Sequence, residues 1–265
     1  ECLVGSEMCI RDSAWTMGGL SMMPATADFT IENPGPDAPY KGANAGYHSR
    51  ILKETEKASP GYYEVELYDH RVKAAMTATT RCSFQKYIFP ECTDSRILMD
   101  LLFPTEWDYG FSVKEATIEQ VSDTRIEGYA KCVSGAWSRW NDWTLYFSIR
   151  FSKPFDSFNG WKGTEVTENV NKISGSDEMG AYVTYKTAEN EEILIQTGLS
   201  LVSIEGARQN LEKEMIRPFR WDFEACVNNA RQTWNSLLGK IKVEGGKEQD
   251  KRKFYTNLYL SLIHI

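Results

Sequence analysis

Hydrophobic and polar residues alternate along most of the chain between residues 62 and 203. The alternation comes in short runs separated by turn-forming residues, which is typical of strands that bury one face. No helical periodicity interrupts these runs, so the pattern predicts a mainly β fold, an antiparallel β-sandwich. The predicted strand segments are 62–69, 72–80, 82–90, 96–103, 112–134, 143–155 and 180–203.

Three of the breaks in this pattern predict specific connections. A tight turn near His70 is expected to join segments 62–69 and 72–80 into a hairpin. The polar residues 91–95 separate two further strands, and the Ala-Glu-Asn-Glu stretch at 188–191 predicts a hairpin loop.

The period changes after Gly206, where helices are predicted. Residues 207–214 indicate a short helix, and residues 221–241 indicate a longer one with Asp222 in its first turn, where a carboxylate is favoured by the helix dipole. Its predicted apolar face consists of Phe223, Val227, Ala230, Trp234, Leu237 and Leu238. After a Gly-Gly break, residues 247–260 predict a second amphipathic helix with Phe254, Leu258 and Tyr259 on one side. Both helices need the sandwich or another domain to cover their apolar faces.

Composition narrows the classes of partner. The 265 residues are 42% hydrophobic, which is ample for a packed core. A net charge of -7 argues against nucleic acid as a partner, because nucleic-acid-binding surfaces carry a positive excess. No run of apolar residues reaches the roughly 18 that a membrane span needs, so none is predicted.

The two ends of the chain resemble something other than protein-coding sequence. Residues 1–13, ECLVGSEMCIRDS, and residues 260–265, LSLIHI, resemble translated adapter sequence of the kind that contaminates metagenomic assemblies. The alternative is a genuine extension. On the adapter interpretation, the natural protein spans residues 14–259 and is cut at both ends, so the lack of a signal peptide carries no information.

Cysteine and histidine offer little for catalysis or metal binding. Outside the two ends the cysteines are Cys82, Cys92, Cys132 and Cys226, with no CxxC pair and no zinc-ligand spacing. A Cys82–Cys92 bridge and four free thiols are both compatible with the sequence. His48 and His70 are the only histidines outside the ends. No metal ligand is therefore predicted in this chain.

For two groups of residues, a functional interpretation competes with one in which the residues are ordinary parts of the fold. The acidic pairs Glu54 with Glu56 and Glu91 with Asp94 could be proposed as a catalytic acid and base, but 37 acidic residues produce such pairs by chance. We therefore assign no catalytic residue. The tryptophans could stack on a ligand or pack in the interior, and His48 could reach a binding pocket or cap a loop. Five tryptophans raise this question: Trp107, Trp137, Trp140, Trp143 and Trp161.

The longest motif, residues 48–91, resembles the family 92 glycoside hydrolases. The matching residues are Ser49, Arg50, Glu54, Glu56, Ala58, Pro60, Gly61, Tyr62 and Tyr63, then Thr77 to Thr79, Arg81, Tyr87, Phe89 and Pro90. Two further blocks agree, YFSIRFSKPF at 146–155 and GLSLVSIEGARQNLEKE at 198–214, followed by Trp221-Asp222-Phe223, Trp234-Asn235 and Phe254-Tyr255-Thr256. Lys53 and Ala75 depart from the pattern, which places subsite details in doubt.

The resemblance implies a secreted, calcium-dependent exo-α-mannosidase in which an N-terminal supersandwich packs on an (α/α)6 barrel. Hydrolysis with inversion then needs a general acid and a general base, and the resemblance places both, and the calcium ligands, in the barrel. We therefore expect residues 14–216 to be the β-sandwich domain without its first strands, and residues 217–259 to be a helical connector to an absent barrel. The expected ligands are α-mannoside glycans, contacted from this domain by Trp137, Trp140 and His48.

The resemblance also implies a periplasmic, outer-surface or secreted location. A different class remains open, a stand-alone carbohydrate-binding sandwich without catalysis. The helices after Gly206 discriminate between the two, because a self-contained binding module has no need of a connector.

Overall fold

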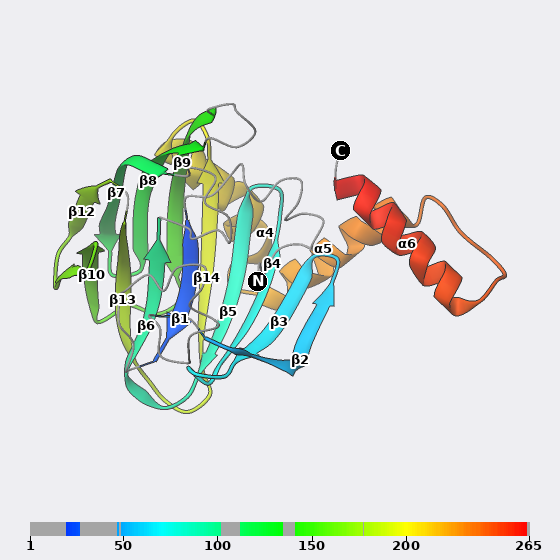
Figure 1. The fold of residues 1–265 in the computed structure, drawn as a ribbon, viewed down its shortest axis with the longest axis horizontal. Helices are drawn as coiled ribbons and strands as arrows, with labels where there is room; N and C mark the ends of the chain where they lie inside the picture. The colour runs from blue at the N-terminus through cyan, green and yellow to red at the C-terminus, as the bar shows by residue number, and fades with distance from the viewer. Residues whose placement is uncertain are drawn as a thin grey trace.

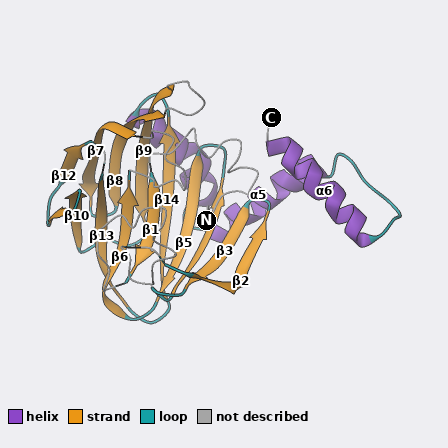
Figure 2. Ribbon diagram, viewed as in Figure 1, coloured by secondary structure: helices purple, strands orange, loops and turns teal. Residues whose placement is uncertain are grey.

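Two antiparallel sheets packed face to face form the body of the protein (Figure 1, Figure 2). The computed structural model describes residues 20–26, 47, 49–101, 112–134, 141–176 and 178–263. Every strand pairing in these ranges is antiparallel, which confirms the predicted fold class.

The larger sheet has nine strands in the order β12-β7-β8-β9-β14-β5-β4-β3-β2. Along the chain these are β2 (Ile51–Ser59), β3 (Tyr62–Leu67), β4 (Val72–Ala78), β5 (Cys82–Phe89), β7 (Ser112–Ser122), β8 (Arg125–Ser134), β9 (Asn141–Phe151), β12 (Lys172–Gly175) and β14 (Glu191–Ser200). The smaller sheet has the order β1-β6-β13-β10-β11. Its strands are β1 (Ser21–Ala25), β6 (Cys92–Asp100), β10 (Ser157–Lys162), β11 (Glu165–Thr167) and β13 (Met179–Thr187).

The main core lies between the two sheets, and strand alternation builds it. In β9, for example, Phe147, Ile149 and Phe151 belong to this core, whereas Tyr146 and Arg150, which alternate with them along the strand, are only half-buried. The same period of two brings Val65 and Leu67 of β3 and Ile97 and Met99 of β6 into the core. Both sheets therefore contribute one apolar face.

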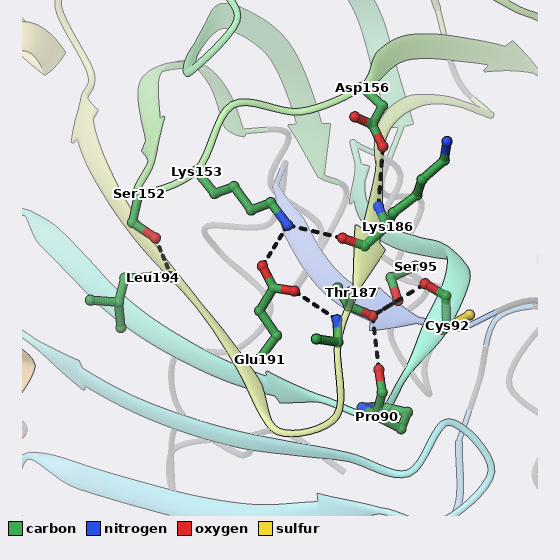
Figure 3. Close-up of polar contacts among 11 residues, drawn as sticks. Pro90, Cys92, Ser95, Ser152, Lys153, Asp156, Lys186, Thr187, Glu191 and Leu194 are labelled. Carbon is green, nitrogen blue, oxygen red and sulfur yellow. Dashed lines mark hydrogen bonds and ion pairs between the residues drawn. The ribbon is translucent and has the colours of Figure 1, made fainter.

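The turn after β13 is not a hairpin, contrary to the sequence prediction. Residues 188–190 do form a turn, with Asn190 at φ 61°, but β13 and β14 belong to different sheets. Polar contacts hold this crossing in place (Figure 3). The Nζ atom of Lys153 donates to the Oε1 atom of Glu191 at 2.5 Å and to the Lys186 carbonyl at 2.9 Å. The hydroxyl of Thr187 donates to the Pro90 carbonyl at 2.8 Å, which links it to the neighbouring crossing from β5 to β6.

The crossing from β5 to β6 also decides the cysteine question. Cys82 begins β5 and Cys92 follows the far end of that strand, in the other sheet. All four described cysteines are free, and three of them are buried, Cys82, Cys132 and Cys226. The free-thiol alternative is therefore confirmed.

A glycine in the centre of β8 allows two neighbouring groups to approach closely. A Cβ atom on Gly128 would lie 2.1 Å from the Thr117 carbonyl oxygen and 2.6 Å from the Cζ atom of Phe147. We expect Gly128→Ala to lower the free energy of unfolding by about 1–3 kcal/mol, because the strand or the ring must move. Urea titration measures this value. Gly175→Ala is the control, since its Cβ would meet only flexible side-chain atoms at 3.3 Å and beyond, and an equal loss in both variants would contradict the steric explanation.

Helices cover the outer face of the nine-stranded sheet. The first helical segment begins at α3 (Ile204–Leu211), continues through a π-helical turn (Glu212–Ile216) and ends with α4 (Arg217–Phe219). It is longer than the predicted 207–214, because Ser203 caps its N-terminus by accepting a hydrogen bond from the Gly206 N–H at 3.0 Å. The predicted longer helix is α5 (Phe223–Leu238), which packs on β3, β4 and β5.

The last helix, α6 (Glu248–Ile263), extends away from the sheets (Figure 1). The rings of Trp234 on α5 and Tyr259 on α6 approach with centroids 4.8 Å apart. Phe254 remains 36% exposed on α6. None of the described helices combines the length and the apolar character that crossing a bilayer demands.

Candidate functional site

The motif residues Ser49 and Arg50 lie at the start of β2, against the turn between β3 and β4. The backbone N–H of Arg50 donates to the Oδ2 atom of Asp69 at 2.7 Å, and its guanidinium donates to Oδ1 of the same carboxylate at 2.5 Å. The Oγ atom of Ser49 accepts the Asp69 N–H at 3.1 Å. The hydrogen bond from the Arg50 side chain is the main cause that holds the pKa of Asp69 below its ordinary value.

Behind this turn, His70 connects two distant segments. Its Nδ1 atom accepts the backbone N–H of Thr26 at 3.3 Å, and its Nε2 atom lies 3.3 Å from the Tyr47 carbonyl oxygen. An acceptor on one side and a donor on the other assign the neutral imidazole with its proton on Nε2. The hydroxyl of Tyr47 in turn donates to the buried carboxylate of Asp100, at the end of β6. Burial, followed by the negative charge of Asp100, raises the pKa of Tyr47.

These contacts connect the start of the motif to distant parts of the fold. They tie the segment before β2 to the hairpin turn at His70 and to both strands of the small-sheet edge, β1 and β6. His48 itself lies outside the described residues, so its predicted contact with sugar stays a prediction, and the same holds for Trp137 and Trp140. Trp107 is also outside the described ranges.

Of the two described tryptophans of that group, Trp161 is buried and Trp143 is half-buried against the core. Trp161 is 3% exposed, and a Cβ on Gly180 would lie 2.2 Å from its ring, which shows that the indole lies against the sheet at a glycine. Trp143 packs against the main core. The packing alternative is therefore confirmed for Trp161 and Trp143.

The acidic pairs considered from the sequence belong mainly to ion pairs and loops. Glu56 pairs with Lys53 and accepts the Tyr63 hydroxyl at 2.7 Å, and Asp94 pairs with Arg96. Glu54 and Glu91 are exposed. No three His, Cys, Asp or Glu side chains in the described ranges lie close enough together to hold a metal ion.

A second polar cluster lies under α3 and has no counterpart in the sequence predictions. Glu127 of β8 is 3% exposed, and Arg208 of α3 donates to it through Nε at 2.8 Å and Nη2 at 2.5 Å. Ser148 of β9 adds a third hydrogen bond at 3.0 Å. Burial alone would raise the pKa of Glu127, but the bonds from Arg208 and Ser148 lower it below the ordinary value. The carboxylate is therefore held ionised and fixes α3 on the sheet.

Hydrogen bonds to a carboxylate also attach the π-helical turn to the nine-stranded sheet. Glu214 accepts the hydroxyl of Thr79 at 2.6 Å, the backbone N–H of Arg81 at 3.0 Å and the Nε atom of Arg81 at 2.7 Å. Thr79 and Arg81 belong to the motif identified from the sequence, so part of that motif anchors the helices. The local sequence around a carboxylate, in strand β8 for Glu127 and in a helical segment for Glu214, gives no indication of its distant partner, so sequence reasoning did not identify either residue.

Aromatic packing attaches α5 to the nine-stranded sheet. Phe223 is 4% exposed, its ring meets Phe84 edge-to-face at 5.3 Å, and Tyr62 lies at 6.5 Å. The Nζ atom of Lys86 lies 4.6 Å from the centroid of the same ring. Asp222 caps the helix by accepting the Ala225 N–H at 2.9 Å. The predicted apolar face is confirmed at its first half, where Phe223, Val227 and Ala230 are buried.

Comparison with known protein families divides the chain at the boundary between the sandwich and the helices. Residues 9–200 match the glycosyl hydrolase family 92 N-terminal domain, and residues 206–265 match the glycosyl hydrolase family 92 catalytic domain. The second match begins within α3, so the helices that cover the nine-stranded sheet belong to it. Comparison with curated protein sequences gives no match.

Solved structures with the same fold are family GH92 enzymes. A family GH92 α-mannosidase from Bacteroides thetaiotaomicron superposes with a TM-score of 0.78 at 26% identity, over 92% of this chain and 32% of that protein. A family GH92 inverting mannosidase from the same bacterium gives 0.72 at 22% identity, over 92% of this chain and 29% of that protein. This chain thus spans about a third of the length of these enzymes.

The profile match to the N-terminal domain covers well over half of the chain and coincides with the described sandwich. The chain therefore belongs to glycosyl hydrolase family 92, and its sandwich is the N-terminal domain of that family.

Proposed function

We propose that the intact protein removes terminal α-linked mannose from glycans with inversion, and that the present residues support this reaction without supplying its carboxylates. The observation that carries the proposal is the family match across both the sandwich and the helices. One solved relative, the GH92 α-mannosidase above, has been crystallised with mannoimidazole. Inversion needs two carboxyl groups about 6.5–9.5 Å apart with room for water between them.

The described carboxylates favour a supporting role. The two most buried ones are Asp100 and Glu127, and each accepts hydrogen bonds that hold it in the fold, from Tyr47 and from Arg208. General acid catalysis needs a carboxyl group with a raised pKa facing the substrate, whereas the pKa of Glu127 is lowered. We propose that the acid, the base and a calcium ion belong to a helical barrel outside this chain.

The role left to this chain is positional. Glu127, Glu214 and Phe223 attach the first helices of the catalytic-domain match to the sheet, and α5 and α6 then lead away from it. We propose that this attachment fixes the barrel against the sandwich. By family resemblance, we also propose a periplasmic, outer-surface or secreted location, which fractionation of cells expressing the complete reading frame would test.

The decisive experiment compares the complete reading frame with the 265-residue chain. Proton NMR of an α-mannobiose digest is expected to show β-mannose as the first product of the complete protein and no release by the 265-residue chain. Hydrolysis by the chain alone would contradict the supporting role, and release of α-mannose first would contradict inversion.

The alternative is a carbohydrate-binding sandwich without catalysis. It would be favoured if the complete protein bound mannose oligosaccharides in calorimetry but released no sugar. The helices on the sheet argue against it, because a binding module does not require them.

A further inference from the structure

Two arginines lie directly opposite each other on the outer face of the nine-stranded sheet. Arg125 of β8 is in register with Arg150 of β9, and Gln196 of β14 is the next residue in the same cross-strand row. Like charges directly opposite on neighbouring strands destabilise a sheet. The arrangement therefore calls for a compensating negative charge.

The described residues do not provide that charge. Within them, neither guanidinium makes a hydrogen bond or an ion pair, and that of Arg150 lies over the ring of Trp221, 4.0 Å from its centroid. Burial, and then the positive charge of Arg125, lowers the pKa of Arg150, while Glu212 acts weakly in the other direction. The guanidinium is thus half-buried and repelled by its neighbour.

The nearby carboxylates are already engaged. Glu127, two residues from Arg125, is bound by Arg208 and Ser148. The Oε1 atom of Glu212 accepts the Nε atom of Arg217 at 3.0 Å. Neither carboxylate therefore forms an ion pair with Arg125 or Arg150, although the chain as a whole carries a net charge of -7.

A buried acceptor lies beside the pair. Gln196 is 0% exposed, and its Nε2 atom donates to the Arg220 carbonyl at 2.6 Å. Its Oε1 atom is buried and has no partner in the described part of the chain. A buried carbonyl oxygen without a donor is costly. A ligand that brings both negative charge and a hydroxyl group would satisfy the arginines and this oxygen together.

We propose that Arg125, Arg150 and Gln196 bind a phosphate group, either as the free ion or as a monoester. Guanidinium groups match phosphate oxygens in paired hydrogen bonds. The P–OH of a monoprotonated phosphate donates to the Oε1 atom of Gln196, and Trp221 covers one side of Arg150. Bound phosphate relieves the repulsion between the arginines. The site is independent of the hydrolysis proposed above.

The test is thermal unfolding of the full chain in inorganic phosphate against sodium chloride of equal ionic strength. At a phosphate concentration tenfold above the titration midpoint, the melting temperature of the wild type is expected to rise by about 3–6 °C. The variants R125Q and R150Q should lose this rise. Arg252, an exposed arginine on α6, supplies the control variant R252Q, which should keep it.

A second comparison separates binding from a merely structural role. In chloride, R125Q should melt at the same temperature as the wild type or higher, because the repulsion is gone, whereas in phosphate the wild type should melt higher. R150K keeps the positive charge and should retain part of the phosphate-dependent rise in melting temperature. This variant is therefore the control for a folding defect in R150Q. Equal rises in melting temperature for wild type, R125Q and R252Q would mean a general salt effect and would overturn the proposal. A lower melting temperature of R125Q in chloride, together with no effect of phosphate on the wild type, would also overturn it.

Glycerol 2-phosphate distinguishes the two sources of the phosphate group. A rise equal to that with inorganic phosphate assigns the site to phosphate monoesters. A rise with inorganic phosphate alone assigns it to the free ion.

Discussion

Replacing Phe223 by alanine is expected to lower the free energy of unfolding by about 3–5 kcal/mol, the usual loss for a fully buried phenylalanine. The ring is 4% exposed at the centre of the contact between α5 and the sheet, against Phe84 and Tyr62. Its removal leaves a cavity that Cys226, Val227 and Leu211 of the same cluster cannot fill without moving the helix.

Urea titration of the full chain measures the global loss, and amide hydrogen exchange shows where it occurs. Exchange is expected to accelerate first in α5, because its attachment to β3, β4 and β5 depends on this ring. Phe254→Ala is the matched control, since Phe254 is 36% exposed on α6. A loss in Phe223→Ala no larger than in Phe254→Ala would show that this packing does not hold the helix.

Replacing Arg208 by alanine is expected to cost about 3 kcal/mol at neutral pH, because it leaves the carboxylate of Glu127 buried without its partner. Glu127 has 4% of its side chain exposed, and Arg208 donates two of the three hydrogen bonds that it accepts from described side chains, at 2.8 and 2.5 Å. The control is Arg217→Ala, whose ion pair with Glu212 is 69% and 43% exposed and should contribute less than about 1 kcal/mol.

The loss should depend on pH in a defined direction. The folded pKa of Glu127 is lowered, so the stability it contributes is present above its unfolded pKa and disappears as the pH falls through the folded pKa. The difference between wild type and Arg208→Ala should therefore be largest near pH 7 and should shrink as the pH falls toward the ordinary pKa of glutamic acid, about 4.3, because burial without Arg208 raises the pKa of Glu127 and the variant takes up the proton first. Denaturant titrations across this range provide the measurement, and a difference that stays constant with pH would exclude Glu127 as its origin.

These two variants also bear on the proposed function. Phe223 and Arg208 are assigned no part in hydrolysis, but they attach to the sheet the helices that match the catalytic domain of the family. In the complete protein, lower mannosidase activity accompanied by a loosened α5 would support the proposed positioning role of the sandwich. Unchanged activity with α5 detached would contradict it.

The sequence alone determined the β class, most of the strands and the apolar face of α5. Alternation with a period of two and the helical period are local properties, so segments such as 82–89 and 223–238 could be located without knowing their partners. The motif around Ser49, Arg50, Thr79 and Arg81 identified the family for the same reason, since short-range sequence is sufficient to recognise it.

Strands with weak alternation escaped prediction. The edge strand β2 is mostly exposed on both faces, and β11 is exposed along its whole length, so neither shows a buried stripe. In β10 both faces are buried and the strand contains Asn159 and Gly160, which are unusual in strands. Burial of both faces removes the alternation from which a strand is recognised.

Only the tertiary structure decided which segments meet. It placed β13 and β14 in different sheets although a short turn joins them. It brought Glu127 to Arg208 across 81 residues of sequence and Arg81 to Glu214 across 133. Charge partners and strand order depend on packing between distant segments, and the free energy of that packing belongs to the whole fold rather than to any local pattern.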